Sequence, residues 1–169
     1  MKGHRTRRGS AMLEFVLTGI PLIFVWISVV QMSLGMWHYH TMQYAIKTAG
    51  AYIAHHGSSY VAAGQPAVQL KDAATVFANA AIGIPDSAIT VTWTSGTTTV
   101  NCTLNNCKTN TTTWPPTTAS SPGTDFTIRA DYLFRSAIAF YSPGTGAGHR
   151  PVRFGAHHLP SYTRQFILF

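Results

Sequence analysis

Acidic side chains are scarce in this sequence, and their scarcity limits the chemistry that the chain can perform. Only five Asp and Glu residues occur among 169, against twelve Lys and Arg, and charged residues make up 10%. Asp125 and Asp131 share a predicted strand, but strand geometry sets them about 20 Å apart, too far for a catalytic carboxylate pair. Ser10 follows a glycine without an accompanying His or acid motif. We therefore predict no catalytic residues, no cofactor and no enzyme activity.

Positive charge is in excess but is concentrated at one end of the chain. The formal net charge is +7, and four of the twelve basic residues, Lys2, Arg5, Arg7 and Arg8, precede Ser10. The other eight basic residues are largely balanced by the five acidic ones. Nucleic-acid binding usually requires a basic stripe on a folded face. The uneven distribution therefore argues against a nucleic-acid partner.

Cysteine is also rare, with only two residues in the chain. Cys102 and Cys107 lie close together in a stretch rich in Thr and Asn. Outside the cytoplasm, such a pair is most simply a disulfide. Two free thiols are the alternative. A zinc site is less favoured, because no His or further Cys is near them in the sequence.

Eight histidines prompt a search for a metal site. Six of them form three close pairs, whose spacing is poor for binding one ion because the two members are either adjacent or two residues apart. The pairs are His38 and His40, His55 and His56, and His157 and His158. We predict no metal ligands and interpret these histidines as surface and interfacial residues. Trp37, Tyr39 and Tyr44 around His38 fit the aromatic belt at the outer face of a membrane.

The longest uncharged run extends from Phe15 to Met36. As a helix, rising about 1.5 Å per residue, it would span roughly 30 Å, the thickness of a bilayer core. Basic residues flank only its N-terminal side, so the positive-inside rule predicts a cytoplasmic N-terminus and an extracytoplasmic chain after Trp37. A buried soluble helix is less favoured, because such long uncharged runs are uncommon in small domains. A signal peptide is less favoured, because its apolar region is usually only about 7–15 residues long.

A single glutamate marks the start of this run. Glu14 is the fifth residue after Gly9, which itself follows a short basic leader. A carboxylate at the edge of a membrane helix is costly and tends to mark function. The arrangement resembles that of type IV prepilins. The run from Glu14 to Leu22, Glu-Phe-Val-Leu-Thr-Gly-Ile-Pro-Leu, is similar to the Glu-Phe-x-Leu-x-x-x-Pro-Leu pattern of TadE-like proteins, which are pseudopilins of the tight-adherence (Tad/Flp) pilus system.

The resemblance covers the N-terminal part of the chain and distinguishes the pilin-like class better than it distinguishes TadE from its sister TadF. It implies that a prepilin peptidase cuts after Gly9, so that Ser10 becomes the mature N-terminus and Glu14 the fifth residue. It also implies that Glu14 and Pro21 act in assembly. Pro21 removes one backbone hydrogen bond of the helix. The hydroxyl of Thr18 or a packed partner helix would compensate for this loss in the bilayer.

The remainder of the chain predicts an α+β domain. An apolar stripe with helical spacing extends the first helix over 37–56, and a second amphipathic helix is predicted over 66–82, with Pro66 in its first turn. Alternating apolar and polar residues predict an antiparallel sheet over 88–169. A Thr/Pro-rich segment within it, 109–124, is predicted to be an exposed loop. A long helix beside a small antiparallel sheet resembles the type IV pilin fold.

These features predict a cytoplasmic leader at 1–9, a transmembrane helix at 10–36 and a periplasmic domain at 37–169 of a single-pass bacterial inner-membrane protein. The favoured function is that of a minor pilin or pseudopilin in a Tad/Flp pilus, and hence in surface adhesion. The implied partners are the prepilin peptidase, other pilin-like subunits, the Tad inner-membrane platform and the lipid bilayer. Incorporation in the fibre and retention in the membrane both fit this role. The alternative is a membrane-anchored binding module that does not enter a fibre.

Overall fold

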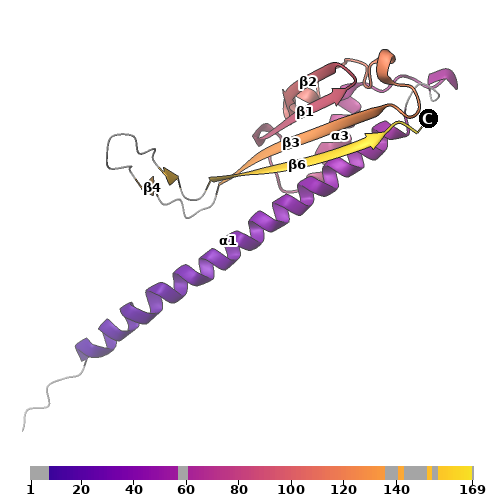
Figure 1. Ribbon diagram of the computed structural model, residues 1–169. Coiled ribbons are helices and arrows are strands. Elements are labelled where there is room, and N and C mark those ends of the chain that lie inside the picture. Colours follow the sequence, from indigo (N-terminus) through magenta and orange to yellow (C-terminus); the bar gives the residue numbers. More distant parts are fainter. Residues whose placement is uncertain (1–7, 57–60, 136–140, 143–151, 154–155, 169) are drawn as a thin grey trace, which may run out of the picture. The chain divides into compact units, whose positions relative to one another are not determined.

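The computed structural model describes residues 8–56, 61–135, 141–142, 152–153 and 156–168 (Figure 1). The chain divides into two compact units, one ending at Met36 and the other running from Trp37 to Phe169. Helix α1, Arg8–Ala54, contributes residues to both units. Each unit is described separately below.

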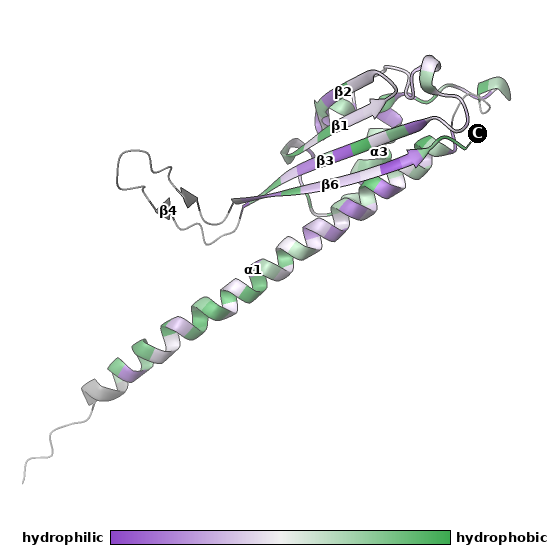
Figure 2. Cartoon of the chain, in the orientation of Figure 1, coloured by the Kyte–Doolittle hydropathy of each residue, from purple (hydrophilic) through white to green (hydrophobic). Residues whose placement is uncertain are grey.

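The first unit consists of the N-terminal part of α1. Its large apolar side chains are exposed, among them Phe15, Leu22 and Trp26, and Figure 2 shows this part of the helix as predominantly hydrophobic. Among the described residues, α1 is the one helix long and apolar enough to cross a membrane, and none of its most apolar window is buried within the protein. Its length and apolar composition match those of a helix that can cross a bilayer. This unit is therefore a candidate single membrane span, as the sequence predicted.

In the second unit, the C-terminal part of α1 presents a buried stripe to the core. The stripe recurs at spacings of three and four residues, as expected for one face of a helix. Its fully buried members are Met42, Ala45, Ile46, Ala49 and Ile53. The chain's last described residues pack against this helix end, because the Leu168 N–H donates to the Ala54 carbonyl oxygen over 2.9 Å.

Helix α3, Leu70–Ala80, adds a second buried face made by Leu70, Ala73, Ala74 and Phe77. It is shorter than the predicted helix over 66–82, and Pro66 is not in its first turn. The residue that precedes the helix is Gln69, whose backbone N–H donates to the Asp72 carboxylate over 3.0 Å. This local bond, together with the acidic side chain in the first turn, favours a helix start at Leu70.

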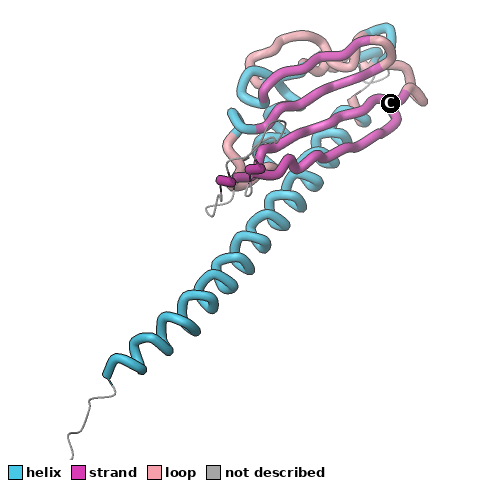
Figure 3. The backbone as a smooth tube through the Cα atoms, turned by 60° about the vertical axis from the view of Figure 1, so that its left-hand side comes forward, coloured by secondary structure: helices cyan, strands magenta, loops and turns pink. Residues whose placement is uncertain are grey.

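Four antiparallel strands form the sheet, in the order β2-β1-β3-β6 (Figure 3). They are β1 Ile89–Ser95, β2 Thr98–Thr103, β3 Asp125–Arg135 and β6 Ala156–Phe166. Buried and more exposed residues alternate along β1 and β3, because successive side chains of a strand point to opposite faces. The inner face shares one hydrophobic core with α1 and α3, which lie on the same side of the sheet. The α+β fold predicted from the sequence is thus confirmed.

Short elements complete the second unit. Two 3-10 helices, η1 Asp86–Ala88 and η2 Thr117–Ala119, flank the sheet strands in the chain, and helix α4, Leu104–Cys107, follows β2 directly. A separate pair of strands, β4 Tyr141–Ser142 and β5 Val152–Arg153, is antiparallel. The tight turn between β1 and β2 contains Gly96 at a φ of 57°, a left-handed conformation that suits glycine.

The Thr/Pro-rich segment 109–124 differs from the exposed loop that its composition predicted. Trp114 is only 1% exposed, and Ala119 and Ser120 are also buried. The Trp114 backbone N–H donates to the Val68 carbonyl oxygen over 2.9 Å, which holds the segment against the residues that precede α3. Burying one large aromatic ring outweighs the polar composition of its neighbours, because that ring removes far more apolar surface from water than a Thr side chain does.

Candidate functional site

The predicted processing position lies at the start of the described helix. Helix α1 begins at Arg8, so Gly9 and Ser10 are in its first turn. The first four backbone N–H groups of a helix have no partner within the helix. Few backbone hydrogen bonds therefore hold the turn that contains Gly9 and Ser10.

Glu14 is exposed in the second turn of α1. Its backbone carbonyl oxygen accepts a hydrogen bond from the Thr18 hydroxyl over 2.7 Å. Its carboxylate has no hydrogen bond or ion pair to any residue that the structure describes.

Pro21 lies inside α1 without ending it. Because proline has no N–H, the Leu17 carbonyl oxygen loses its α-helical donor. The predicted compensation by the Thr18 hydroxyl is wrong, because this hydroxyl donates to the Glu14 carbonyl oxygen instead. A threonine in a helix reaches the carbonyls three or four residues before it, and Leu17 is its immediate neighbour. The other predicted source of compensation, a packed partner helix, stays a prediction.

Other hydroxyl groups in the apolar run are paired within the helix. Ser28 donates to the Phe24 carbonyl oxygen over 2.7 Å, and Ser33 donates to the Val29 carbonyl oxygen over 2.9 Å. In hydrocarbon, each unsatisfied polar group would cost several kcal/mol. These local bonds allow the two serines to enter a bilayer without a partner from elsewhere.

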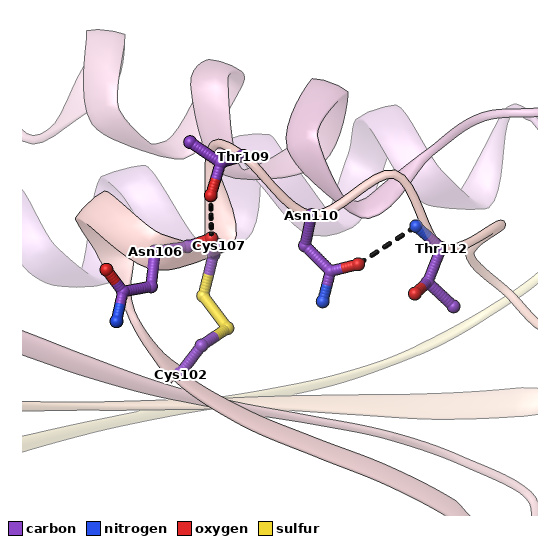
Figure 4. Close-up of a disulfide and its surroundings, with 6 residues drawn as sticks. All are labelled: Cys102, Asn106, Cys107, Thr109, Asn110 and Thr112. Atoms are coloured by element: carbon purple, nitrogen blue, oxygen red, sulfur yellow. Dashed lines mark hydrogen bonds between the residues drawn. A yellow bond between two sulfur atoms is a disulfide. The ribbon is translucent and has the colours of Figure 1, made fainter.

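Cys102 and Cys107 form a disulfide, with their Cα atoms 5.6 Å apart (Figure 4). The bond joins the end of β2 to α4, and Cys107 is fully buried in the core. Beyond it, the Thr109 hydroxyl donates to the Asn106 carbonyl oxygen over 2.9 Å, and Lys108 pairs with Asp86 over 2.9 Å. The predicted disulfide is confirmed, and the two alternatives, free thiols and a zinc site, are excluded for this pair.

Removing this disulfide should measurably destabilise the second unit. The loop between the two cysteines is short, so the chain-entropy model predicts a loss of about 2 kcal/mol in unfolding free energy for Cys102→Ala combined with Cys107→Ala. Denaturant unfolding of the full chain in detergent, followed by circular dichroism, measures this loss. A reductant should destabilise the native chain and leave the double variant unchanged. Complete thiol labelling of the native chain without reductant would contradict the bond.

The histidines differ in how their side chains are packed and exposed. His38 is not a simple surface residue, because its ring packs edge-on against Tyr132 and Phe134, with ring centroids 5.5 Å apart in both cases. His158 is exposed and pairs with Asp131 over 2.9 Å. Within the described part of the chain, no group of three or more His, Cys, Asp or Glu side chains lies close enough to hold a metal ion. The packing of the half-buried His38 ring was missed, because its partners are about a hundred residues away in the sequence.

The N-terminal residues of this chain match a known family. The model of the family described as TadE-like protein matches residues 9–50. The matched segment contains Gly9, Ser10, Glu14 and Pro21, and it extends from the exposed apolar run into the buried stripe of the second unit. The N-terminal segment is therefore TadE-like, which confirms the resemblance seen in its motif. No curated protein and no solved structure gives a significant match to the chain.

Proposed function

We propose that this chain is a minor pilin or pseudopilin subunit that takes part in assembling a Tad/Flp-type pilus, and thereby in surface adhesion. One observation carries the proposal: the TadE-like match at 9–50 coincides with an exposed apolar helix that begins at the predicted processing position. A processed leader, a membrane helix with one acid near its start and a small extracytoplasmic domain are the parts that such a subunit requires. The chain acts in this proposal by assembly and not by catalysis.

The membrane orientation follows from charge. The basic residues before Ser10 stay in the cytoplasm, and the second unit lies in the periplasm. The disulfide between Cys102 and Cys107 supports a periplasmic location of the second unit, because disulfides persist in the periplasm and are rare in the cytosol. The bilayer concerned is the bacterial inner membrane, where the prepilin peptidase and the Tad platform would meet the subunit.

The role in assembly is tested by co-purification. A tagged full-length chain, extracted from membranes of its own host, should carry pilin-like subunits or Tad platform proteins with it, and its deletion should reduce piliation. Comparing sheared fibres with the membrane fraction then separates a subunit that enters the fibre from one that stays at its base. Unchanged piliation in the deletion strain, without pilin-like partners in the extract, would overturn the proposal.

Processing is tested independently by intact mass. The protein extracted from membranes should lack Met1 to Gly9 and begin at Ser10. Gly9→Val should remain unprocessed, because a branched side chain replaces the glycine of the cleavage position. Gly19→Ala is the matched control within the same helix, since a Cβ at Gly19 would be 3.6 Å from its nearest neighbour, an ordinary contact. A native N-terminus near Met36, or an uncleaved chain in a host with an active peptidase, would contradict the prediction.

A further inference from the structure

The outer face of the sheet carries a row of polar and aromatic side chains that the assembly role does not use. In register across the four strands, Thr92 pairs with Asn101 on β2 and with Arg129 on β3, and Arg129 pairs with Tyr162 on β6. We call Asn101, Thr92, Arg129 and Tyr162 the outer row. Trp93 and Ile128, the next residues along their strands, are fully buried. The outer row therefore points away from the core.

The outer row is open to solvent. Asn101 and Arg129 are exposed, Tyr162 is 58% exposed, and Thr92 is half-buried between its neighbours. Thr90 and Thr94 flank Thr92 on the same face of β1, and the Thr94 hydroxyl lies 3.3 Å from that of Thr99. The surface is a flat array of hydroxyl, amide and guanidinium groups beside one aromatic ring. A flat array suits an extended ligand better than a small molecule, which binds in a concave site.

Two arginines on this face, Arg129 and Arg135, have no ion pair among the described residues, and of the two only Arg129 belongs to the outer row. Asp125 is engaged by Arg164 over 2.7 Å, and Asp131 is engaged by His158 over 2.9 Å. Arg129 has no hydrogen bond or ion pair to any residue within the described ranges. A guanidinium presents five N–H donors in a planar fork that matches a carboxylate with two parallel hydrogen bonds. The complementary group on a ligand is thus an oxyanion such as a carboxylate.

The other members of the outer row indicate what carries that carboxylate. A sugar ring has an apolar face of C–H groups, which can pack on the exposed ring of Tyr162, and hydroxyl groups, which can bond to Asn101 and Thr92. Neighbouring strands are about 4.8 Å apart, so the row is about 14 Å long, enough for a few linked sugars. Nucleic acid is a poorer fit, because its affinity requires several cations that neutralise successive phosphates.

We propose that the outer row binds an acidic polysaccharide, with Arg129 pairing to a sugar carboxylate and Tyr162 stacking on a sugar ring. The surface belongs to the second unit and involves none of the residues assigned to processing or helix assembly. The proposal therefore goes beyond the role in pilus assembly, and the two can fail separately.

The test measures binding of polygalacturonate to the processed full-length protein in detergent micelles. Wild-type protein should bind polygalacturonate. It should bind the fully methyl-esterified polymer, which has the same backbone without charge, with an affinity lower by at least about tenfold. Arg129→Gln and Tyr162→Ala should each weaken binding to polygalacturonate by about tenfold. Unchanged circular dichroism establishes that both variants are folded.

Arg135→Gln is the matched control. Arg135 is exposed on the same strand and the same face, but it lies about 20 Å from Arg129, outside the outer row. The Arg135→Gln variant should bind polygalacturonate with the same affinity as the wild type. The proposal is overturned if wild-type protein does not bind polygalacturonate, or if Arg135→Gln weakens binding as much as Arg129→Gln does. It is also overturned if single-stranded DNA binds as tightly, because the attraction would then be a general effect of charge.

Discussion

Glu14→Ala should abolish co-purification with pilin-like partners while leaving cleavage after Gly9 and membrane insertion intact. The Glu14 carboxylate is exposed and has no partner in the part of the chain that the structure describes. An unpaired charge moving into hydrocarbon costs at least about 2.5 kcal/mol. Cleavage would create a positive amine at Ser10, four residues earlier in the same helix. The amine of one subunit can instead meet Glu14 of a neighbour, and only one axial offset of two helices satisfies both charges.

Two further variants separate charge from shape. Glu14→Gln keeps the length of the side chain and removes its charge, so it should fail in assembly as Glu14→Ala does. Thr18→Val is the matched control one turn away: it removes the hydroxyl that donates to the Glu14 carbonyl oxygen and leaves the charge in place. It should assemble normally. Intact mass reports cleavage, and membrane fractionation reports insertion.

A competing explanation predicts the opposite result. A carboxylate at the edge of a bilayer can extend into the headgroup region, where water solvates it and no partner is needed. Glu14 would then have little effect on how helices stack. Wild-type co-purification and piliation in the Glu14→Ala strain would establish this explanation and exclude the role of Glu14 in setting the register of the helices.

The sequence predicted the features that depend on local patterns. The uncharged run from Phe15 to Met36 predicted the exposed apolar helix, because length and composition alone decide whether a helix can span a bilayer. The stripe from Met42 to Ile53 was predicted from helical spacing and is fully buried at its apolar positions, except for Tyr52, which is half-buried. The disulfide between Cys102 and Cys107 was predicted because the chain contains no other cysteine and the two lie close together in the sequence.

Features that depend on distant contacts were not predicted. His38 packs on two aromatic residues of β3, and nothing near it in the sequence indicates this. The outer row became visible only when the strand register placed Arg129 beside Thr92 and Tyr162. The average composition of the Thr/Pro-rich segment predicts an exposed loop and does not reveal that the fold buries individual side chains within it, the largest being that of Trp114. Composition reports the solvation of a whole segment, whereas burial is decided by individual side chains.

Trp114→Ala should destabilise the second unit by about 3–5 kcal/mol, the range for removing a large aromatic ring from a core. Trp114 is 1% exposed and belongs to the same hydrophobic core as Trp93 and Phe77. Its indole N–H has no hydrogen-bond partner among the described residues, so the expected loss comes from apolar contacts and from the cavity that remains. Its backbone bond to Val68 is retained in the variant. Denaturant unfolding of the full chain in detergent, followed by circular dichroism, measures the change.

Thr118→Ala is the matched control from the same segment. Thr118 is exposed, so its truncation should change the unfolding free energy by less than about 0.5 kcal/mol. If the segment were an exposed loop, as its composition indicates, the two variants would behave alike, with small effects from both. A large loss confined to Trp114→Ala would instead establish that one buried ring holds residues 109–124 against the domain. Equal small changes in both variants would contradict the buried position of Trp114.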